Sequence, residues 1–600
     1  MRSIKGLTGY VGDVSDLPMP DCAPATGDVS IKQMAERAFN YLTRSPKPEY
    51  NYQPVFQVFP LRFPSVREGD DPVVNCDTDA RMDWEWYYMR DIVGDGRGAE
   101  IEEKFHARMR AYINSDGLAI AHGGCYREDL ENAVYTEDDD IIHVWGTTKI
   151  LYSLAEDYLR TQNPERLELA TRIFNGLRKL YIWGDDQVGP WCYAPNGMGP
   201  VDRGDKPNSK SWGTQPNPIV GPLVRYWQAS GDPAALAFAK AAANGIMWGK
   251  LPGGIKFFPD GSFLHGDTHH DGHATLGTAG RVGHSHASLH AVWGICELGL
   301  VVSDPSYIDF AKRSFDWMLS RGTGTGWFPA MPDNCNETCT VSDMISIATL
   351  IGRSGYSEYF DYAERYFRNY IVNLQFILTD EIREYYRRAH ADRTPDEIEH
   401  QLRLLERIQG AIIGGSGIND YENNLLGRVS GFCIFGCCAP EGMRAIYTIW
   451  LNSAVKERDG MHVNMAFNVD NAVATVTSLL PKCGGMKVVP KQTGTLHLRV
   501  PHWANKADVK VMRIGDAVSL RWEGDFAVID ASAGDEITAM WPLITFTHLA
   551  QVWNVSAPDL AVTFEWHGNR AVSVTPAPQS GAIPLLTRDI RRDLVPLGSQ

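Results

Sequence analysis

The chain has 600 residues, of which 44% are hydrophobic, so it can bury a large core. Its net charge of -16 argues against a nucleic acid or an anionic membrane as a partner, because most of the surface would repel either one. No signal-peptide-like run opens the chain and no apolar stretch of about 18 residues occurs, so we expect a cytoplasmic protein. Its 11 cysteines, an odd number, fit a reducing compartment in which cysteines are buried, catalytic or metal-bound.

Three similar helix starts recur in the first half of the chain. Asn163-Pro164, Asp232-Pro233 and Asp304-Pro305 each combine a preferred N-cap residue with a proline, which is favoured in the first turn of a helix. The prolines lie 69 and 72 residues apart, and the apolar residues around each pair recur with a helical period. We therefore predict a helical repeat with two hairpins in each unit.

Long loops rich in tryptophan, glycine and histidine separate these helices, at residues 183–212 and 250–286. Loops of this length and composition are typical of binding sites. We therefore predict a closed ring of helices whose loops build one concave face. An open helical solenoid is the alternative.

The second half of the chain changes character twice. Residues 380–410 are strongly charged and indicate an inserted amphipathic helix or helix pair on the surface. After about residue 460 apolar and polar residues alternate, as in Leu496, Leu498 and Val500, which is typical of strands. We expect three parts: an N-terminal extension (1–30), a helical catalytic domain (31–460) and a β-sandwich accessory region (461–600).

Four residues form the strongest chemical signal in the sequence. Glu337 and Cys339 lie two positions apart, and Cys437 and Cys438 are adjacent later in the chain. Three thiolates and one carboxylate make a complete tetrahedral ligand set for zinc. The spacing is not that of a CxxC motif, and free cysteines are often buried, so two small core residues near a helix start are the alternative reading.

Two other segments combine polar and aromatic side chains. Seven histidines lie between residues 265 and 290; they indicate either a second metal site or, as we favour, imidazoles that hydrogen-bond a sugar. Asp79 and Trp84 lie in a run of carboxylates and aromatic rings of the kind that bind sugar hydroxyls and stack on sugar faces. The alternative for this run is a charged helix start with a buried aromatic stripe.

The sequence resembles glycoside hydrolase family 127, the bacterial β-L-arabinofuranosidases, and their divergent relatives. The resemblance rests on four segments in the family's order: Val282-Gly283-His284, Glu337-Thr338-Cys339, Cys437-Cys438-Ala439-Pro440 with Arg444, and Leu496-His497-Leu498-Arg499-Val500-Pro501-His502-Trp503-Ala504. It implies a mainly α protein with an (α/α)6 barrel followed by β-sandwich domains.

The resemblance also implies roles for individual residues. Zinc would be bound by Glu337, Cys339, Cys437 and Cys438, and Cys437 would be the nucleophile. His143 and His284 would line the sugar pocket, and Glu364 would lie near the substrate hydroxyls. A metal-activated thiolate can attack an anomeric carbon, and water then releases the sugar with net retention.

The sequence departs from the family's pattern at the general acid/base. The family has a glutamate upstream of the Glu-x-Cys motif, whereas residues 321–336 contain no glutamate and one carboxylate, Asp333. Gln215-Pro216-Asn217 also stand where the family has His-Pro-Glu. We therefore expect the proton donor to be Asp333, or else Glu128 or Asp129.

The leading interpretation is a retaining glycosidase that acts on plant or microbial oligosaccharides. One alternative is a sugar lyase or another carbohydrate-modifying enzyme on the same toroid, with structural zinc. Another is a non-catalytic, zinc-stabilised carbohydrate-binding protein. The expected partner is a carbohydrate, and the oligomeric state stays open, with a homo-oligomer as one option.

Overall fold

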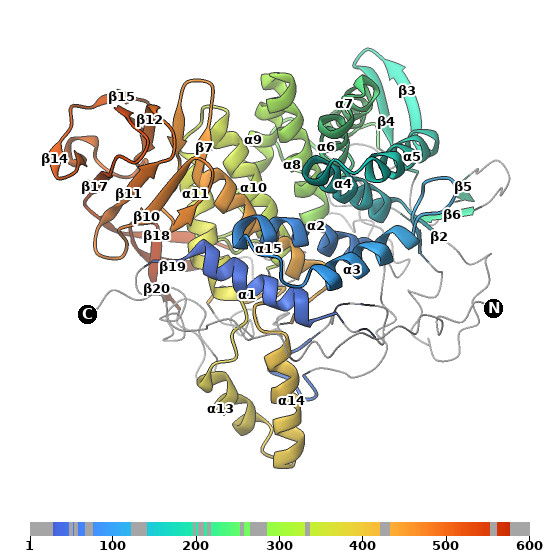
Figure 1. Cartoon of the computed structure of the whole chain (residues 1–600), viewed down its shortest axis with the longest axis horizontal. Coiled ribbons are helices and arrows are strands. Elements are labelled where there is room, and N and C mark those ends of the chain that lie inside the picture. The colour runs from blue at the N-terminus through green and yellow to red at the C-terminus, as the bar shows by residue number, and fades with distance from the viewer. Residues whose placement is uncertain are drawn as a thin grey trace.

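The computed structural model describes residues 28–46, 58–65, 76–121, 141–195, 209–212, 218–251, 257–263, 285–330, 336–419, 433–552 and 561–576, with a few isolated positions between them (48, 52, 54, 200 and 201). Within these segments a large helical body lies beside a β-rich region (Figure 1). None of the helices in these segments is both long and apolar enough to span a bilayer.

Six helices in the described residues form a closed inner ring, because each packs against the next and the last packs against the first. They are α2 (Cys76–Val93), α4 (Val144–Thr161), α6 (Val220–Ser230), α8 (Ser285–Val302), α10 (Thr338–Arg353) and α15 (Cys438–Ser453). Helices such as α8 and α10 are buried on nearly every side, since neighbours cover both flanks. The predicted closed ring is therefore confirmed over the open solenoid.

Six outer helices alternate with the inner ones along the described chain and complete the predicted (α/α)6 barrel. They are α1 (Ile31–Arg44), α3 (Ala99–Ala111), α5 (Pro164–Leu180), α7 (Pro233–Met247), α9 (Pro305–Leu319) and α11 (Tyr359–Tyr366). The last of them continues through a π-helical turn, Phe367–Ile371, into α12 (Val372–Leu374).

The three predicted helix starts are confirmed as the starts of consecutive outer helices. The side chains of Asn163, Asp232 and Asp304 accept hydrogen bonds from backbone N–H groups two positions later, at 3.0, 2.9 and 2.9 Å. The expected content of each repeat was wrong, however. In the described residues each unit holds one outer and one inner helix rather than two hairpins.

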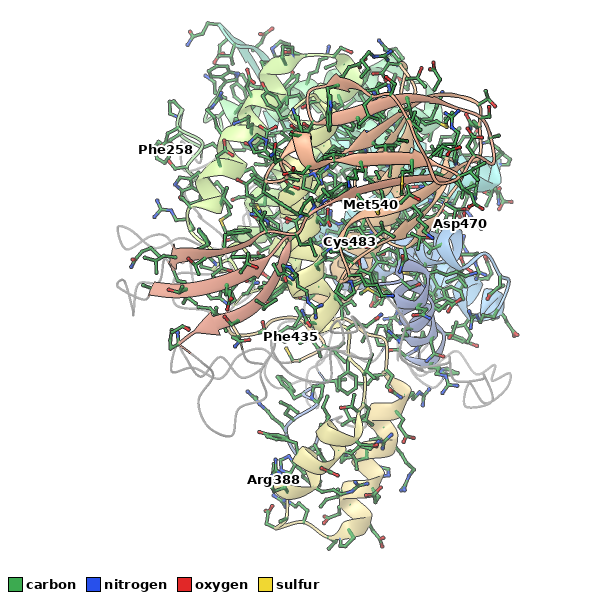
Figure 2. All side chains as sticks on the ribbon, turned by 90° about the vertical axis from the view of Figure 1, so that its left-hand side faces the viewer. Phe258, Arg388, Phe435, Asp470, Cys483 and Met540 are labelled. Carbon is green, nitrogen blue, oxygen red and sulfur yellow. The ribbon has the colours of Figure 1, made fainter. Side chains whose placement is uncertain are left out.

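The charged stretch folds as the helices α13 (Asp380–Ala389) and α14 (Pro395–Arg407), which project from one end of the barrel (Figure 1). A capping box formed by Thr394 and Glu397 begins α14. The pair is anchored where His390 Nε2 lies 3.1 Å from the Leu61 carbonyl oxygen. Figure 2 labels Arg388 on this projection and Phe435 at the end of the barrel above it.

Two sheets face each other in the β-rich region and form the predicted sandwich. One has the order β14-β13-β17-β11-β10-β9 and the other β15-β16-β12-β8-β7. Their bounds are β7 (Ala454–Lys456), β8 (Met461–Val463), β9 (Val469–Asp470), β10 (Ala474–Ser478), β11 (Gly484–Pro490), β12 (Gly494–Arg499), β13 (Lys510–Arg513), β14 (Asp516–Ala517), β15 (Arg521–Glu523), β16 (Phe526–Ala531) and β17 (Ile537–Trp541). Leu496, Leu498 and Val500 lie in the core between them, as the alternation predicts.

A third sheet belongs to the core of the barrel rather than to that of the sandwich. It consists of β18 (Thr545–Gln551), β19 (Ala561–His567) and β20 (Arg570–Thr575). Its buried residues Val562, Phe564 and Trp566 join the hydrophobic cluster of the helices. Smaller strands precede inner helices: β1 (Ile120–Ala121), β2 (Ile141–His143), β3 (Ile182–Asp186), β4 (Gly189–Tyr193), β5 (Pro200–Val201) and β6 (Ser209–Trp212).

A buried ion-pair network joins the barrel to the sandwich. Arg499 of β12 contacts Asp361 at 2.9 Å and Glu364 at 3.4 Å, both on the outer helix α11. Glu364 also accepts a hydrogen bond from Arg368 at 3.0 Å. The structure therefore places Glu364 in the contact between α11 and the sandwich, where its carboxylate is already engaged by two guanidinium groups.

Replacing Arg499 with methionine should destabilise the protein strongly, because the buried Asp361 would lose its guanidinium partner and the buried Glu364 would lose one of its two. Removing one member of a buried ion pair typically costs about 3–5 kcal/mol. Urea unfolding should show a loss of this size for Arg499→Met and a much smaller one for Arg521→Met, whose side chain on β15 is 64% exposed. Equal effects of the two changes would contradict a structural role for this network.

Candidate metal and nucleophile site

Glu337, Cys339, Cys437 and Cys438 lie together where two inner helices begin. Glu337 is the N-cap of α10 and Cys437 is the N-cap of α15. The Sγ atom of Cys438 lies 3.4 Å from that of Cys339 and 3.5 Å from that of Cys437. Glu337 Oε1 lies 3.8 Å from Cys437 Sγ and 3.6 Å from Cys438 Sγ. All four donor atoms fall within 4.8 Å of one another.

These distances fit the edges of a zinc tetrahedron. Zinc–sulfur bonds of about 2.3 Å and zinc–oxygen bonds of about 2.1 Å give edges of about 3.8 Å between two sulfurs and about 3.6 Å between sulfur and oxygen. A disulfide would bring two sulfurs to about 2.05 Å, and the three cysteines are free. The donor types and their spacing therefore suit one zinc ion.

Backbone contacts behind the cluster hold the two helix starts together. The Thr338 N–H donates to the Gly414 carbonyl at 2.9 Å, and the Gly414 N–H donates to the Cys433 carbonyl at 2.6 Å. A Cβ atom at Gly414 would lie 2.7 Å from the Phe435 ring and 3.4 Å from the Cβ of Cys438. A larger residue at this position would clash with the Phe435 ring, which lies two residues before Cys437.

The three cysteines differ in exposure and protonation. Cys339 and Cys438 are fully buried, whereas Cys437 is partly exposed. Burial raises the pKa of the Cys339 and Cys438 thiols, while hydrogen bonds from those thiols lower the pKa of Cys437 well below its usual value. The positive end of the α15 dipole favours a thiolate at the same position. Cys437 is therefore the most accessible of the three thiols, and the one whose pKa is lowered.

A buried network of charges lies directly behind the cysteines. Arg81 of α2 donates to Cys339 Sγ at 3.9 Å and to Glu441 at 3.5 Å. It also donates to His286 Nε2 at 2.7 Å, so that His286 donates through Nδ1 to Asp343, 2.6 Å away. A chain of hydrogen bonds thus runs from Asp343 through His286 and Arg81 to the cysteines.

Arg444 of α15 completes this network by donating to Glu441 at 2.6 Å and to Asp343 at 2.7 Å. His290 Nδ1 lies 3.1 Å from the same Asp343 carboxylate. The trio of His286, His290 and Asp343 has metal-like spacing, but guanidinium groups bind two of its members. We therefore interpret it as a support for the cysteine cluster and not as a second metal site.

Sequence reasoning missed most of this network. Arg81 lies within the polar and aromatic run that was singled out, and His286 and His290 lie within the histidine-rich segment. Asp343 carries a local signal, since it follows Cys339 by one helical turn on a buried helix. Glu441 follows Cys437 by one turn in the same way.

The other predicted site residues do not all converge on the cysteines. Asp79 is buried and accepts hydrogen bonds from Arg108 at 3.0 Å and Tyr112 at 3.1 Å, which ties α2 to the segment at α3. Trp84 packs edge-on against Tyr152 with ring centroids 5.2 Å apart. These contacts match the alternative reading of that run as a charged helix with a buried aromatic stripe.

His143 is fully buried at the start of α4, where its Nδ1 accepts a hydrogen bond from the Gly146 N–H at 2.8 Å. Its ring therefore caps a helix at the barrel end where the inner helices begin. The predicted residues His284, Asp333, Glu128 and Asp129 lie outside the described residues.

Comparison with known proteins gives structural matches alone. No protein-family model matches the sequence, and no curated protein matches it either. A family 127 β-L-arabinofuranosidase from Geobacillus stearothermophilus T6 superposes with a TM-score of 0.55 at 13% identity, over 90% of this chain and 80% of the other. The chain has the fold of that family. A second family 127 β-arabinofuranosidase gives a TM-score of 0.52 at 14% identity, over 92% and 84% of the two chains.

A structure described as a glycoside hydrolase gives a TM-score of 0.54 at 11% identity, over 93% of this chain and 84% of the other. The three matches cover both the barrel and the sandwich. They confirm at the level of fold the resemblance that the sequence motifs carry.

Arg81→Lys should weaken zinc binding by about 10–100-fold, the usual effect of losing a partner of a metal ligand. A lysine keeps the charge but cannot reach Cys339, Glu441 and His286 together as the planar guanidinium does. Competition with a chromogenic chelator measures the affinity. Arg90→Lys, on the same helix but paired with Glu102, is the matched control. Equal zinc affinity in the two variants would contradict the network's role.

Proposed function

We propose that the protein is a retaining glycoside hydrolase in which Cys437 is the nucleophile. The observation that carries this proposal is a partly exposed thiol beside two buried ones, at a helix start inside an (α/α)6 barrel, and the hydrogen bonds from the two buried thiols that lower its pKa support it. A thiolate needs such an electropositive and accessible setting to react. Of the three clustered cysteines, Cys437 has this setting.

The proposed reaction has two steps. Cys437 Sγ attacks the anomeric carbon, a carbon–sulfur bond forms, and the bond to the departing alcohol breaks while a carboxylic acid gives that oxygen its proton. In the second step the same carboxylate removes a proton from water. The water oxygen then displaces Sγ from the anomeric carbon, which restores the thiolate and the original configuration.

Glu337, Cys339, Cys437 and Cys438 would hold the zinc ion. When bound, zinc would keep its cysteine ligands deprotonated at neutral pH. Glu337 and the two buried cysteines orient Cys437 by fixing the helix starts. Arg81 and Arg444 offset the negative charge that gathers at this end of the barrel.

For the substrate we propose β-L-arabinofuranosides from plant or microbial oligosaccharides, since two of the structural matches are described as β-arabinofuranosidases. We further propose that residues 31–460 form the catalytic domain and residues 461–600 an accessory region, following an extension at 1–30. The acidic chain would act in the cytoplasm on imported oligosaccharides, without nucleic-acid or membrane partners.

A mechanism-based probe should label Cys437. An L-arabinofuranose analogue with a haloacetamide at the anomeric position places an electrophile where the thiolate attacks, and peptide mapping then locates the modified residue. Cys437→Ser should lose both the label and turnover, whereas Cys192→Ser, at a buried cysteine in β4, should keep both. Turnover that survives in Cys437→Ser would favour a lyase with structural zinc, and sugar binding without any turnover would favour a binding protein.

The proton donor can be identified from how the turnover of each variant depends on the leaving group of the substrate. Asp333→Ala, Glu128→Ala and Asp129→Ala are compared on a natural glycoside and on an activated aryl glycoside, with the exposed Glu168→Ala as control. Loss of general acid catalysis lowers the reaction rate by about 10²–10⁴-fold. The true donor's variant should show this loss on the natural substrate and near-normal turnover on the aryl one. If all three variants match the control, none of them is the donor.

A further inference from the structure

A hairpin beside the barrel has aromatic rings on the face that points away from the helices. Strands β3 and β4 form it, and it packs against the outer helix α7 (Figure 1). Asn244 of α7 donates to the Pro190 carbonyl oxygen at 2.9 Å, and Cys192 of β4 is buried in the barrel core. Side chains alternate along a strand, so Trp191 and Tyr193 point to the opposite, outer face.

Trp191 lies across this outer face. Its pairing partner on β3 is Gly184, and a Cβ atom there would lie 2.2–2.5 Å from three atoms of the six-membered indole ring. The ring therefore covers the glycine backbone, which it could not do above any other residue. The ring of Tyr193 is parallel to the indole within 6°, with centroids 6.1 Å apart. The two rings thus offer parallel faces on one side of the hairpin.

Polar side chains fix the indole and border one of its edges. Trp191 Nε1 donates to Asp186 Oδ2 at 3.2 Å, and Lys250 Nζ lies 2.6 Å from the same oxygen. The side chains of Asp186 and Lys250 are 34% and 23% exposed. An ammonium group has three donors and a carboxylate about four acceptor sites, so both groups can bind further partners from solvent.

An apolar residue extends the surface on the other side of the rings. Ile182 is 44% exposed and pairs with Tyr193 across the hairpin. Trp191 and Tyr193 are half-buried, and Tyr193 also packs against the core cluster, which holds its ring in place. Contiguous apolar surface with a polar border is typical of a binding site, whereas single exposed apolar residues are not.

We propose that this face of the hairpin binds a neutral oligosaccharide chain, with one sugar stacked on Trp191 and the next beside Tyr193. A sugar ring has an apolar face of C–H groups and hydroxyls around its rim, so a flat indole bordered by a carboxylate and an ammonium group matches both parts. Asp186 and Lys250 neutralise each other, while the exposed Asp185 and the net charge of -16 disfavour an acidic polymer. The surface does not depend on the proposed glycosidase activity.

The test is affinity electrophoresis of the full-length protein through native gels that contain a soluble polysaccharide. Three neutral probes (debranched arabinan, arabinoxylan and mixed-linkage β-glucan) are compared with acidic polygalacturonate. At least one neutral probe should retard the wild type, and polygalacturonate should not. Trp191→Ala should lower the affinity for that probe by about tenfold, because stacking on an aromatic ring contributes about that much.

Gly184→Ala is the sharper variant, since it keeps every aromatic side chain but places a Cβ atom in the space of the indole ring. It should weaken binding as Trp191→Ala does, and it replaces that variant if Trp191→Ala does not fold. Trp522→Ala removes a half-buried indole from β15 of the sandwich and is the control. It should bind the probe as the wild type does.

Three results would overturn the proposal. One is a wild type that no neutral probe retards, or that polygalacturonate retards equally. Another is a folded Trp191→Ala or Gly184→Ala that binds the probe as the Trp522→Ala control does. The third is a dimer, seen by sedimentation, that Trp191→Ala dissociates without any change in retardation, because the face would then be a contact between two copies of the chain.

Discussion

The packing of α15 against α2 is the contact on which the rest of the architecture depends, because it closes the inner ring. Tyr88 and Tyr447 stack there with parallel rings 3.9 Å apart. Arg81 and Glu441 form an ion pair across the same contact. Burying these charges is favourable only when each has its partner. The two helices must therefore pack in the one alignment that pairs Arg81 with Glu441. Closing the ring in that register also brings Cys437 and Cys438 beside Cys339.

Helix starts explain why this end of the barrel suits anionic chemistry. The inner helices α10 and α15 both begin at the cluster, so their unpaired N–H groups and their dipoles favour negative charge there. Trp145 and His286, each the second residue of its inner helix, also stack at 5.7 Å. Several helix starts thus share one end of the ring.

Helix α10 connects the two parts of the molecule. Its first turn carries Cys339, and its last residue, Arg353, pairs with Glu457 of the sandwich. A helix of 16 residues spans about 24 Å, so the cysteine cluster and this contact with the sandwich lie at opposite ends of one rigid element. The sandwich therefore contacts the barrel through buried and half-buried ion pairs, of which Arg499 with α11 is the most buried.

The sequence by itself determined features that depend on near neighbours in the chain. Asn163, Asp232 and Asp304 cap their helices because an N-cap side chain bonds an N–H only two positions away. The alternation at Leu496 and Leu498 predicted the inner face of the sandwich for the same reason. The grouping of Glu337, Cys339, Cys437 and Cys438 was predictable from their ligand-type side chains together with the family resemblance, and the structure brings the four together.

Only the tertiary structure decided which helix faces meet. Arg81 reaches His286 and Glu441 across 205 and 360 positions, and no local pattern encodes those separations. Asp79 and Glu364 have the chemistry of sugar ligands, yet the fold turns both toward arginines of neighbouring elements, Arg108 and Arg499. A buried carboxylate needs a partner wherever it lies, so its residue type alone does not distinguish a substrate contact from an ion pair that closes the fold.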